Sequence, residues 1–262
     1  MSALVRKYWA FFRIAAAQAR RERGELYGRM VFFAVILGVF SSLWRAVSEA
    51  GMPVAAHPDA LVWYLATTEW IVLSVPPIHI EIEEAVRRGD VVCQLGRPVS
   101  YVGAAFAEGL GLLAVRAPVL GVTACVSAFV MTGWMPPLQV LACVVPFGLV
   151  SAALITALYL WIGLLAFWLE DVSPVYWVTQ KLMFVLGGLM LPLELYPDFI
   201  RQAAAFTPFP SVLAGPASFV LQSGGAGSGV LAGTLAIWAG VTALAVGLVF
   251  RRATSTLTIN GG

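Results

Sequence analysis

Charged and metal-binding side chains are scarce in this sequence. Only 11% of the 262 residues are Asp, Glu, Lys or Arg, whereas soluble domains carry about 25%. There are three cysteines and two histidines, with no Cys-x-x-Cys pair. This scarcity argues against a disulfide framework, a metal site and a metal-dependent enzyme. Cys93, Cys125 and Cys143 are expected to pack as small apolar side chains.

Catalytic motifs are also missing from the sequence. No Gly-x-x-x-x-Gly-Lys-Ser/Thr motif is present, so there is no loop to cradle phosphates and we expect no ATP hydrolysis by this chain alone. No Ser-His or Cys-His arrangement indicates a nucleophile, which argues against intramembrane proteolysis. We therefore expect no catalytic residue, metal ligand, bound cofactor or nucleic-acid partner.

Apolar residues dominate what remains. They make up 60% of the chain, more than a soluble core of this length could bury. A helix needs about 20 apolar residues to cross the hydrocarbon core of a membrane. Six stretches qualify: approximately Gly28–Trp44, Ala60–Ile80, Tyr101–Thr132, Leu138–Leu169, Pro174–Leu193 and Val230–Phe250. The sequence therefore predicts an all-α integral membrane protein with six transmembrane helices in a single domain, residues 1–262.

Basic residues gather on one side of these six spans. Twelve of the sixteen Lys and Arg residues precede the first span, lie between the second and third, or follow the sixth. Only Arg45 and Arg201 fall in the opposite loops. Because positive charge marks cytoplasmic loops, we expect both termini on the cytoplasmic side.

Two segments outside the spans have distinctive patterns. Residues 1–27 predict an interfacial amphipathic helix, with aromatic and small side chains on one arc and cations on the other. An ordinary packed cytosolic helix is the alternative. Residues 192–218 contain five prolines but are still apolar. This combination predicts short helices, broken by the prolines, that re-enter the membrane from outside.

The last span carries a run of small residues that share one helix face. Its glycines are Gly229, Gly233, Gly240 and Gly247. Small residues let membrane helices approach closely, so this face is expected to pack against another helix. Chance in a helix rich in Gly and Ala is the alternative.

Residues 81–98, EIEEAVRRGDVVCQLGRP, form the densest charged segment. They predict a short amphipathic cytoplasmic helix that begins near Pro77 and ends at Gly89. Two pairs have the favourable i,i+4 order: Glu83 with Arg87 and Glu84 with Arg88. Its apolar face, which anchors the helix, is expected to comprise Ile78, Ile82, Ala85 and Val86. This face, together with charges of both signs, suits docking on a soluble partner. A solvated loop helix with no partner is the alternative.

Four ionisable residues are expected inside or at the edge of the membrane: Glu69, Glu108, Arg116 and Lys181. A charge at mid-membrane costs at least ~2.5–3.5 kcal/mol, so it usually faces a wet path or a partner. Glu69, midway along the second span, therefore lines a substrate path, pairs with Arg116 or Lys181, or stays protonated and idle. Lys181 is close enough to the cytoplasmic end of its span to snorkel.

Three motifs, in this order, resemble the membrane subunit of bacterial type-2 ABC transporters. They are YWAFFRIAAAQARRERGELYGRM, EIEEAVRRGDVVCQLGRPVSYV and MLPLELYPDFIRQAAAFTPFPSVLAGP. The resemblance covers nearly the whole chain and is to a six-span branch whose members have about this length.

The resemblance implies a permease of an ABC exporter in the bacterial cytoplasmic membrane, moving a drug, peptide or other amphiphile outward. Two permeases, identical or related, would sit on two ATP-binding subunits that hold ATP and Mg. The charged helix would be the coupling helix, acting through Glu81, Glu83, Glu84, Arg87, Arg88, Gly89 and Asp90. A non-ABC secondary transporter, which would need an inverted repeat, and a scaffold subunit that transports nothing are the alternatives.

Overall fold

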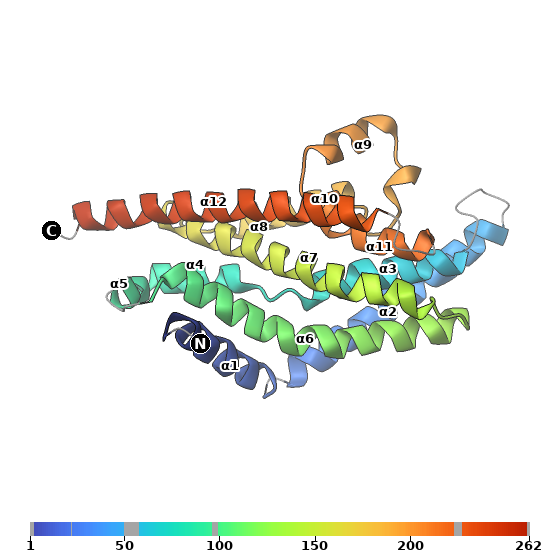
Figure 1. The fold of residues 1–262 in the computed structure, drawn as a ribbon, viewed down its shortest axis with the longest axis horizontal. Helices are drawn as coiled ribbons and strands as arrows, with labels where there is room; N and C mark the ends of the chain where they lie inside the picture. Colours follow the sequence, from blue (N-terminus) through green and yellow to red (C-terminus); the bar gives the residue numbers. More distant parts are fainter. Residues whose placement is uncertain (1–2, 22, 50–57, 96–98, 223–226, 261–262) are drawn as a thin grey trace.

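The chain is a bundle of long helices. The computed structural model describes residues 3–21, 23–49, 58–95, 99–222 and 227–260, in which helices are the only regular secondary structure. Five helices in these ranges are long and apolar enough to cross a membrane: Arg23–Val47, Pro58–Arg87, Tyr101–Thr132, Leu138–Phe167 and Ser228–Ser255. They lie lengthwise along an elongated bundle (Figure 1). The chain is therefore an all-α integral membrane protein, as its composition predicted.

The bundle is built from α2 (Arg23–Glu49), α3 (Pro58–Ser74), α6 (Tyr101–Thr132), α7 (Leu138–Leu164) and α12 (Ser228–Asn260). The helix α3 is the most enclosed, because α2, α6, α7 and α11 all pack against it. The 32 residues of α6 span about 48 Å at ~1.5 Å per residue, more than the ~30 Å hydrocarbon core. The helix α6 must therefore tilt, bend at Pro118 or extend beyond the apolar layer.

The fifth predicted span is shorter than the sequence suggested. Within Pro174–Leu193 the helix α8 (Ser173–Leu186) has only 14 residues, about 21 Å at ~1.5 Å per residue. It ends because Gly188 takes a left-handed conformation with φ of +67°. The apolar character of Leu189–Leu193 extended the predicted span to Leu193, but the backbone leaves the helix before these residues. The six-span count therefore stays a prediction.

The proline-rich segment folds into short helices, as its sequence predicted. It contains α9 (Asp198–Ala205), α10 (Phe209–Val212) and α11 (Ala214–Leu221), preceded by a 3-10 turn at Leu193–Leu195. The helix α11 packs against α3 and α7, which buries Phe219 and Val220. These helices lie over the half of the bundle away from the C-terminus (Figure 1).

The N-terminal helix α1 (Ala3–Ala19) lies against the first half of α6 (Figure 1). Its Ala15 and Ala19 are buried with Leu112 of α6. A Cβ atom at Gly111 would lie 2.3 Å from the carbonyl oxygen of Phe12, and one at Gly103 would lie 2.8 Å from the Tyr8 ring. The predicted apolar arc of α1 therefore divides: its small residues contact α6, while Val5 and Trp9 are half exposed.

The glycine face predicted on the last span has no close neighbour among the residues that the structure describes. A Cβ atom at Gly229, Gly233, Gly240 or Gly247 would meet no described atom within 4 Å. The close approach predicted there is therefore not made by another described helix of this chain. Contact with lipid or with another subunit stays a prediction. Glycines that do allow close contacts lie elsewhere, among them Gly103 and Gly111 on α6, Gly148 and Gly163 on α7, and Gly215 on α11, where a Cβ atom would lie 2.5 Å from Leu231.

Candidate functional site

The charged helix after the second span is α4 (Ile78–Arg87), with Pro77 at its N-cap. Gly89, with φ of +76°, ends it in the left-handed conformation that its sequence predicted. A second short helix, α5 (Asp90–Leu95), follows directly. Residues 96–98 of the predicted coupling segment lie outside the described residues.

The apolar face of α4 is anchored on the end of α7. Ile78 and Ile82 are buried, as the spacing predicted. A Cβ atom at Gly163 of α7 would lie 2.9 Å from Cβ of Ile82 and 3.0 Å from Cα of His79, so only glycine permits this approach. The His79 ring stacks on Tyr176 of α8, with 4.0 Å between ring centroids. The helix α4 is thus fixed to both α7 and α8.

The opposite face of α4 is charged and exposed. Both predicted pairs form: Arg88 is 2.8 Å from Glu84, and Arg87 is 3.6 Å from Glu83. The Glu84–Arg88 pair is exposed and contributes only ~0–1 kcal/mol. The Glu83 side chain is only 12% exposed, and its partner Arg87 reaches the surface. Glu84, Arg87 and Arg88 thus present both signs of charge on a surface that the described part of the bundle leaves uncovered.

The loop between α7 and α8 adds an acid to this surface. Asp171 accepts hydrogen bonds from Ser173, including one of 2.8 Å from its backbone N–H. These bonds lower the pKa of the Asp171 carboxyl, and the charge of Arg87 lowers it further. The 3-10 turn Leu165–Phe167, which begins this loop, packs against α4. The exposed surface therefore comes from two separate segments.

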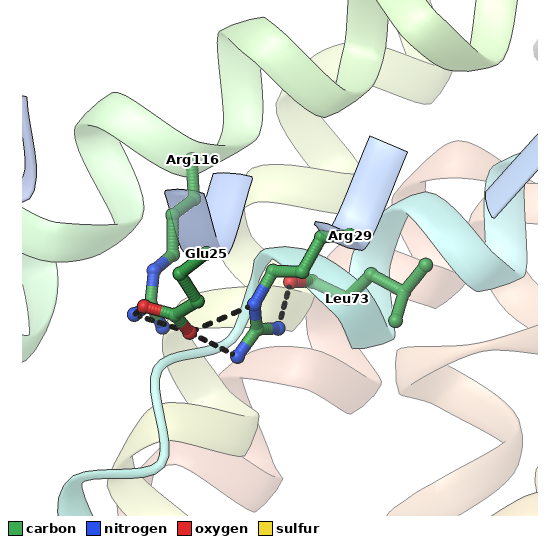
Figure 2. Close-up of polar contacts among 4 residues, drawn as sticks. All are labelled: Glu25, Arg29, Leu73 and Arg116. Carbon is green, nitrogen blue, oxygen red and sulfur yellow. Dashed lines mark hydrogen bonds and ion pairs between the residues drawn. The ribbon is translucent and has the colours of Figure 1, made fainter. Parts of the chain in front are cut away.

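A proline pair separates α3 from α4 and leaves a carbonyl without its helical donor. In a continuing helix the Leu73 carbonyl would accept from the N–H of residue 77, but Pro77 has none. Nη1 of Arg29, on α2, donates to this oxygen at 2.7 Å. Figure 2 shows the Arg29 side chain reaching the end of α3. Arg29 thus stabilises the backbone just before the charged helix.

The same arginine belongs to a three-residue charge cluster. Glu25 lies between Arg29, at 2.9 Å, and Arg116 of α6, at 2.8 Å (Figure 2). The Arg116 side chain is only 6% exposed. The cluster joins α2, α6 and the end of α3 at the level where α3 gives way to α4.

This cluster corrects one of the alternatives for Glu69. Arg116 pairs with Glu25 rather than with Glu69. Lys181 is exposed and lies over the rings of Trp177 and Phe184, at 5.6 and 5.4 Å from their centroids. In the described part of the chain, therefore, neither cation pairs with Glu69. Glu69 itself is 4% exposed, so it is buried in the bundle.

Glu108 lies where α6 passes α4. It lines a cavity of about 200 Å³ together with Glu81 and Tyr101. Of the four ionisable residues predicted in the membrane, Arg116 and Glu108 thus lie near the charged helix, Lys181 faces outward, and Glu69 is enclosed.

Sequence reasoning missed Glu25, Arg29 and Asp171 at this site. Arg29 was counted only as one of the basic residues that set orientation. Glu25 and Arg116 are 91 positions apart, and no local spacing rule connects such residues. A signal for Arg29 did exist, because Pro77 removes a donor from the end of a span and so demands a replacement.

The fold and this site define a multi-pass membrane protein with a helix anchored at one end of its bundle and charged on its outer face. The model of the family described as ABC-2 family transporter protein matches residues 58–261. The chain belongs to this family and is the membrane component of an ABC transporter. The match favours the permease over the secondary transporter that the residues alone left open. No curated protein matches the chain.

Proposed function

We propose that this chain is the permease subunit of an ATP-driven exporter, and that a separate ABC ATP-binding subunit docks on α4. The observation that carries the proposal is the two-sided build of this helix. Buried Ile78 and Ile82 hold it to the bundle, and Glu84, Arg87 and Arg88 are exposed beyond it. Because the helix is fixed to the bundle, its negative and positive side chains keep fixed positions, which favours recognition by a groove of complementary charge. The partner would hold ATP and Mg.

The proposed assembly has two ATP-binding subunits and a second permease, identical or related. Nucleotide-driven closure of the ATP-binding subunits would move α4, and α3 with it. An amphiphile would leave between the two permeases. Glu69 remains our candidate for a residue of that path, because the two cations proposed as its partners lie elsewhere. It is 4% exposed on the most enclosed helix, so it would reach the path only when α3 moves.

Reversing the charges of Arg87 and Arg88 tests the docking surface. The double variant Arg87→Glu, Arg88→Glu is expected to insert normally, because both side chains are exposed. Recovery of the co-purifying ATP-binding subunit should fall about tenfold or more, which corresponds to a loss of ~1.4 kcal/mol in binding. The measurement is affinity purification from membranes with quantification of the co-purified subunit.

The matched control for that experiment is Arg251→Glu, Arg252→Glu, which makes the same charge change near the end of α12. It should retain the ATP-binding subunit. Equal recovery from the wild type and the α4 variant would refute docking on α4. A wild type that brings down no such subunit would refute the proposed function and favour a scaffold role.

The proposed orientation places both termini in the cytoplasm of a bacterial cell, with the protein in the inner membrane. Asp59 and Asp198 begin α3 and α9 and are exposed. A cysteine at either position is expected to react with a membrane-impermeant thiol reagent in intact cells. Cys93, which is exposed and not packed as its sequence suggested, should react only after the cells are opened. Protection of both introduced cysteines in intact cells would reverse the orientation.

A further inference from the structure

Two hydroxyl groups on α3 hold the turn that ends α8. Tyr64 donates to the Gly188 carbonyl at 2.6 Å, and Thr68 lies 2.7 Å from the Leu189 carbonyl. Both side chains are buried, with relative exposures of 1% and 0%. They are four residues apart and so lie on one face of α3. Thr68 is also 3.0 Å from the Leu65 carbonyl of its own helix, but its single proton favours the shorter contact.

The turn needs donors because of its own sequence. Gly188, with φ of +67°, takes the backbone out of the helix. Residue 192, which would supply the helical N–H for the Gly188 carbonyl, is a proline. A buried carbonyl without a donor is costly. Three successive carbonyls are satisfied from elsewhere in the chain: that of Gly187 by the backbone N–H of Ala214, and the next two by α3.

The turn and α3 are closely packed at this contact. A Cβ atom at Gly188 would lie 3.0 Å from the Tyr64 hydroxyl oxygen and 3.0 Å from the Leu191 carbonyl. The turn leads into the proline-rich segment, and through Gly187 it is also bonded to the start of α11. A displacement of α3 along its axis therefore moves the turn or breaks both hydroxyl contacts.

The other end of α3 leads to the proposed docking surface. The Arg29 contact holds the Leu73 carbonyl there, and two prolines connect α3 to α4. The helix thus makes specific polar contacts at two levels, one beside α4 and one beside the turn after α8.

We propose that Tyr64 and Thr68 are positioning residues that pass the movement of α4 and α3 to the turn at Gly187–Leu189, and so to the proline-rich segment. The inference rests on the proposed function only in that an ATP-binding subunit moves α4. In this arrangement α3 moves as a rigid helix, and its two hydroxyl groups carry the turn with it through hydrogen bonds to the backbone carbonyls of Gly188 and Leu189. Loss of both hydroxyls leaves α4 free to respond to nucleotide while the turn does not follow.

The test measures whether the turn still follows nucleotide. A reporter cysteine replaces Leu189, which is 1% exposed, in a chain whose Cys93, Cys125 and Cys143 are changed to serine. The complex with its ATP-binding subunit is placed in nanodiscs. The rate of reaction with a water-soluble maleimide is then measured without nucleotide and after trapping with ATP and vanadate. Trapping should change the rate about tenfold with wild-type α3, the factor that ~1.4 kcal/mol in an opening equilibrium produces.

In the double variant Tyr64→Phe, Thr68→Val the rate should become independent of nucleotide. Thr67→Val is the matched control, because among the described residues the Thr67 hydroxyl donates within α3, to the Trp63 carbonyl at 2.9 Å. It should keep the full response, and so should Thr68→Ser, which retains the hydroxyl. A purely structural role would change the rate in both conditions alike and leave their ratio intact.

Several outcomes would overturn the inference. A wild-type response in the double variant would do so, as would a wild type whose reporter ignores nucleotide although the ATP-binding subunit is bound and active. If the double variant does not fold, the single variants Tyr64→Phe and Thr68→Val decide, and a full response in both overturns the proposal. Absence of the ATP-binding subunit from the purified complex would instead be a failure of the proposed function.

Discussion

Glu25→Gln is expected to destabilise the protein more than Arg116→Met, although Arg116 is the more buried partner. The Glu25 carboxylate is shared by two guanidinium groups, those of Arg29 and Arg116. Removing it leaves two cations close together, one of them with a side chain only 6% exposed. Removing Arg116 leaves the pair of Glu25 with Arg29 intact, and methionine suits the apolar surroundings.

Breaking a fully buried ion pair costs about 3–5 kcal/mol. Glu25 is 41% exposed, so screening reduces the expected loss for Glu25→Gln to about 1–3 kcal/mol. The measurement is the thermal unfolding midpoint of the purified chain in detergent for both variants. Glu84→Gln, which removes an exposed pair, is the control and should cost below about 0.5 kcal/mol. A larger loss in Arg116→Met than in Glu25→Gln would contradict this account of the cluster.

Gly111→Ala is expected to displace α1 from α6. The added methyl group would lie 2.3 Å from the Phe12 carbonyl oxygen and 3.0 Å from Cβ of Ala15. The first of these is a backbone atom, so no rotamer change relieves the clash. Overpacking of this kind costs about 1–3 kcal/mol. We expect a lower unfolding midpoint and faster tryptic cleavage at Arg20 and Arg21, which follow α1.

Gly240→Ala is the matched control for this prediction. A Cβ atom there meets no described atom within 4 Å, and alanine is a better helix former than glycine by about 1 kcal/mol. The control should therefore be neutral or slightly stabilising, with unchanged tryptic cleavage. Equal behaviour of the two variants would show that the close contact at Gly111 does not hold α1 on α6.

The sequence predicted most reliably what depends on neighbours along the chain. The i,i+4 pairs of α4, its buried Ile78 and Ile82, and its end at Gly89 all follow from local spacing, and all are confirmed. The pair of Glu25 with Arg116 does not, because it depends on how α2 packs against α6. The same limit explains why a pair of Glu69 with Arg116 or Lys181 was left open as one alternative, which the described contacts of those two cations do not support.

Small-residue patterns show a second limit of the sequence. Gly103, Ala107 and Gly111 on α6 have the same spacing of four as Gly229 and Gly233 on α12. Only the α6 set has a close neighbour within the described chain. A periodic run of glycines predicts a face that another helix can approach, but the partner depends on topology and assembly. The predicted length of α8 was wrong for a different reason: hydropathy does not detect that Gly188 takes a left-handed conformation.

The face of α6 that contacts α1, with Gly103 and Gly111 on it, has an evolutionary consequence. It receives α1 through a backbone carbonyl at Phe12 and through the methyl groups of Ala15 and Ala19, so it recognises the shape of a helix more than the identity of its side chains. The two helices therefore tolerate change unequally. Positions 103 and 111 of α6 must stay small, whereas the exposed positions of α1, such as Val5 and Trp9, can diverge. The exposed side chains of the N-terminal helix can thus change in evolution while the face of α6 that contacts it stays the same.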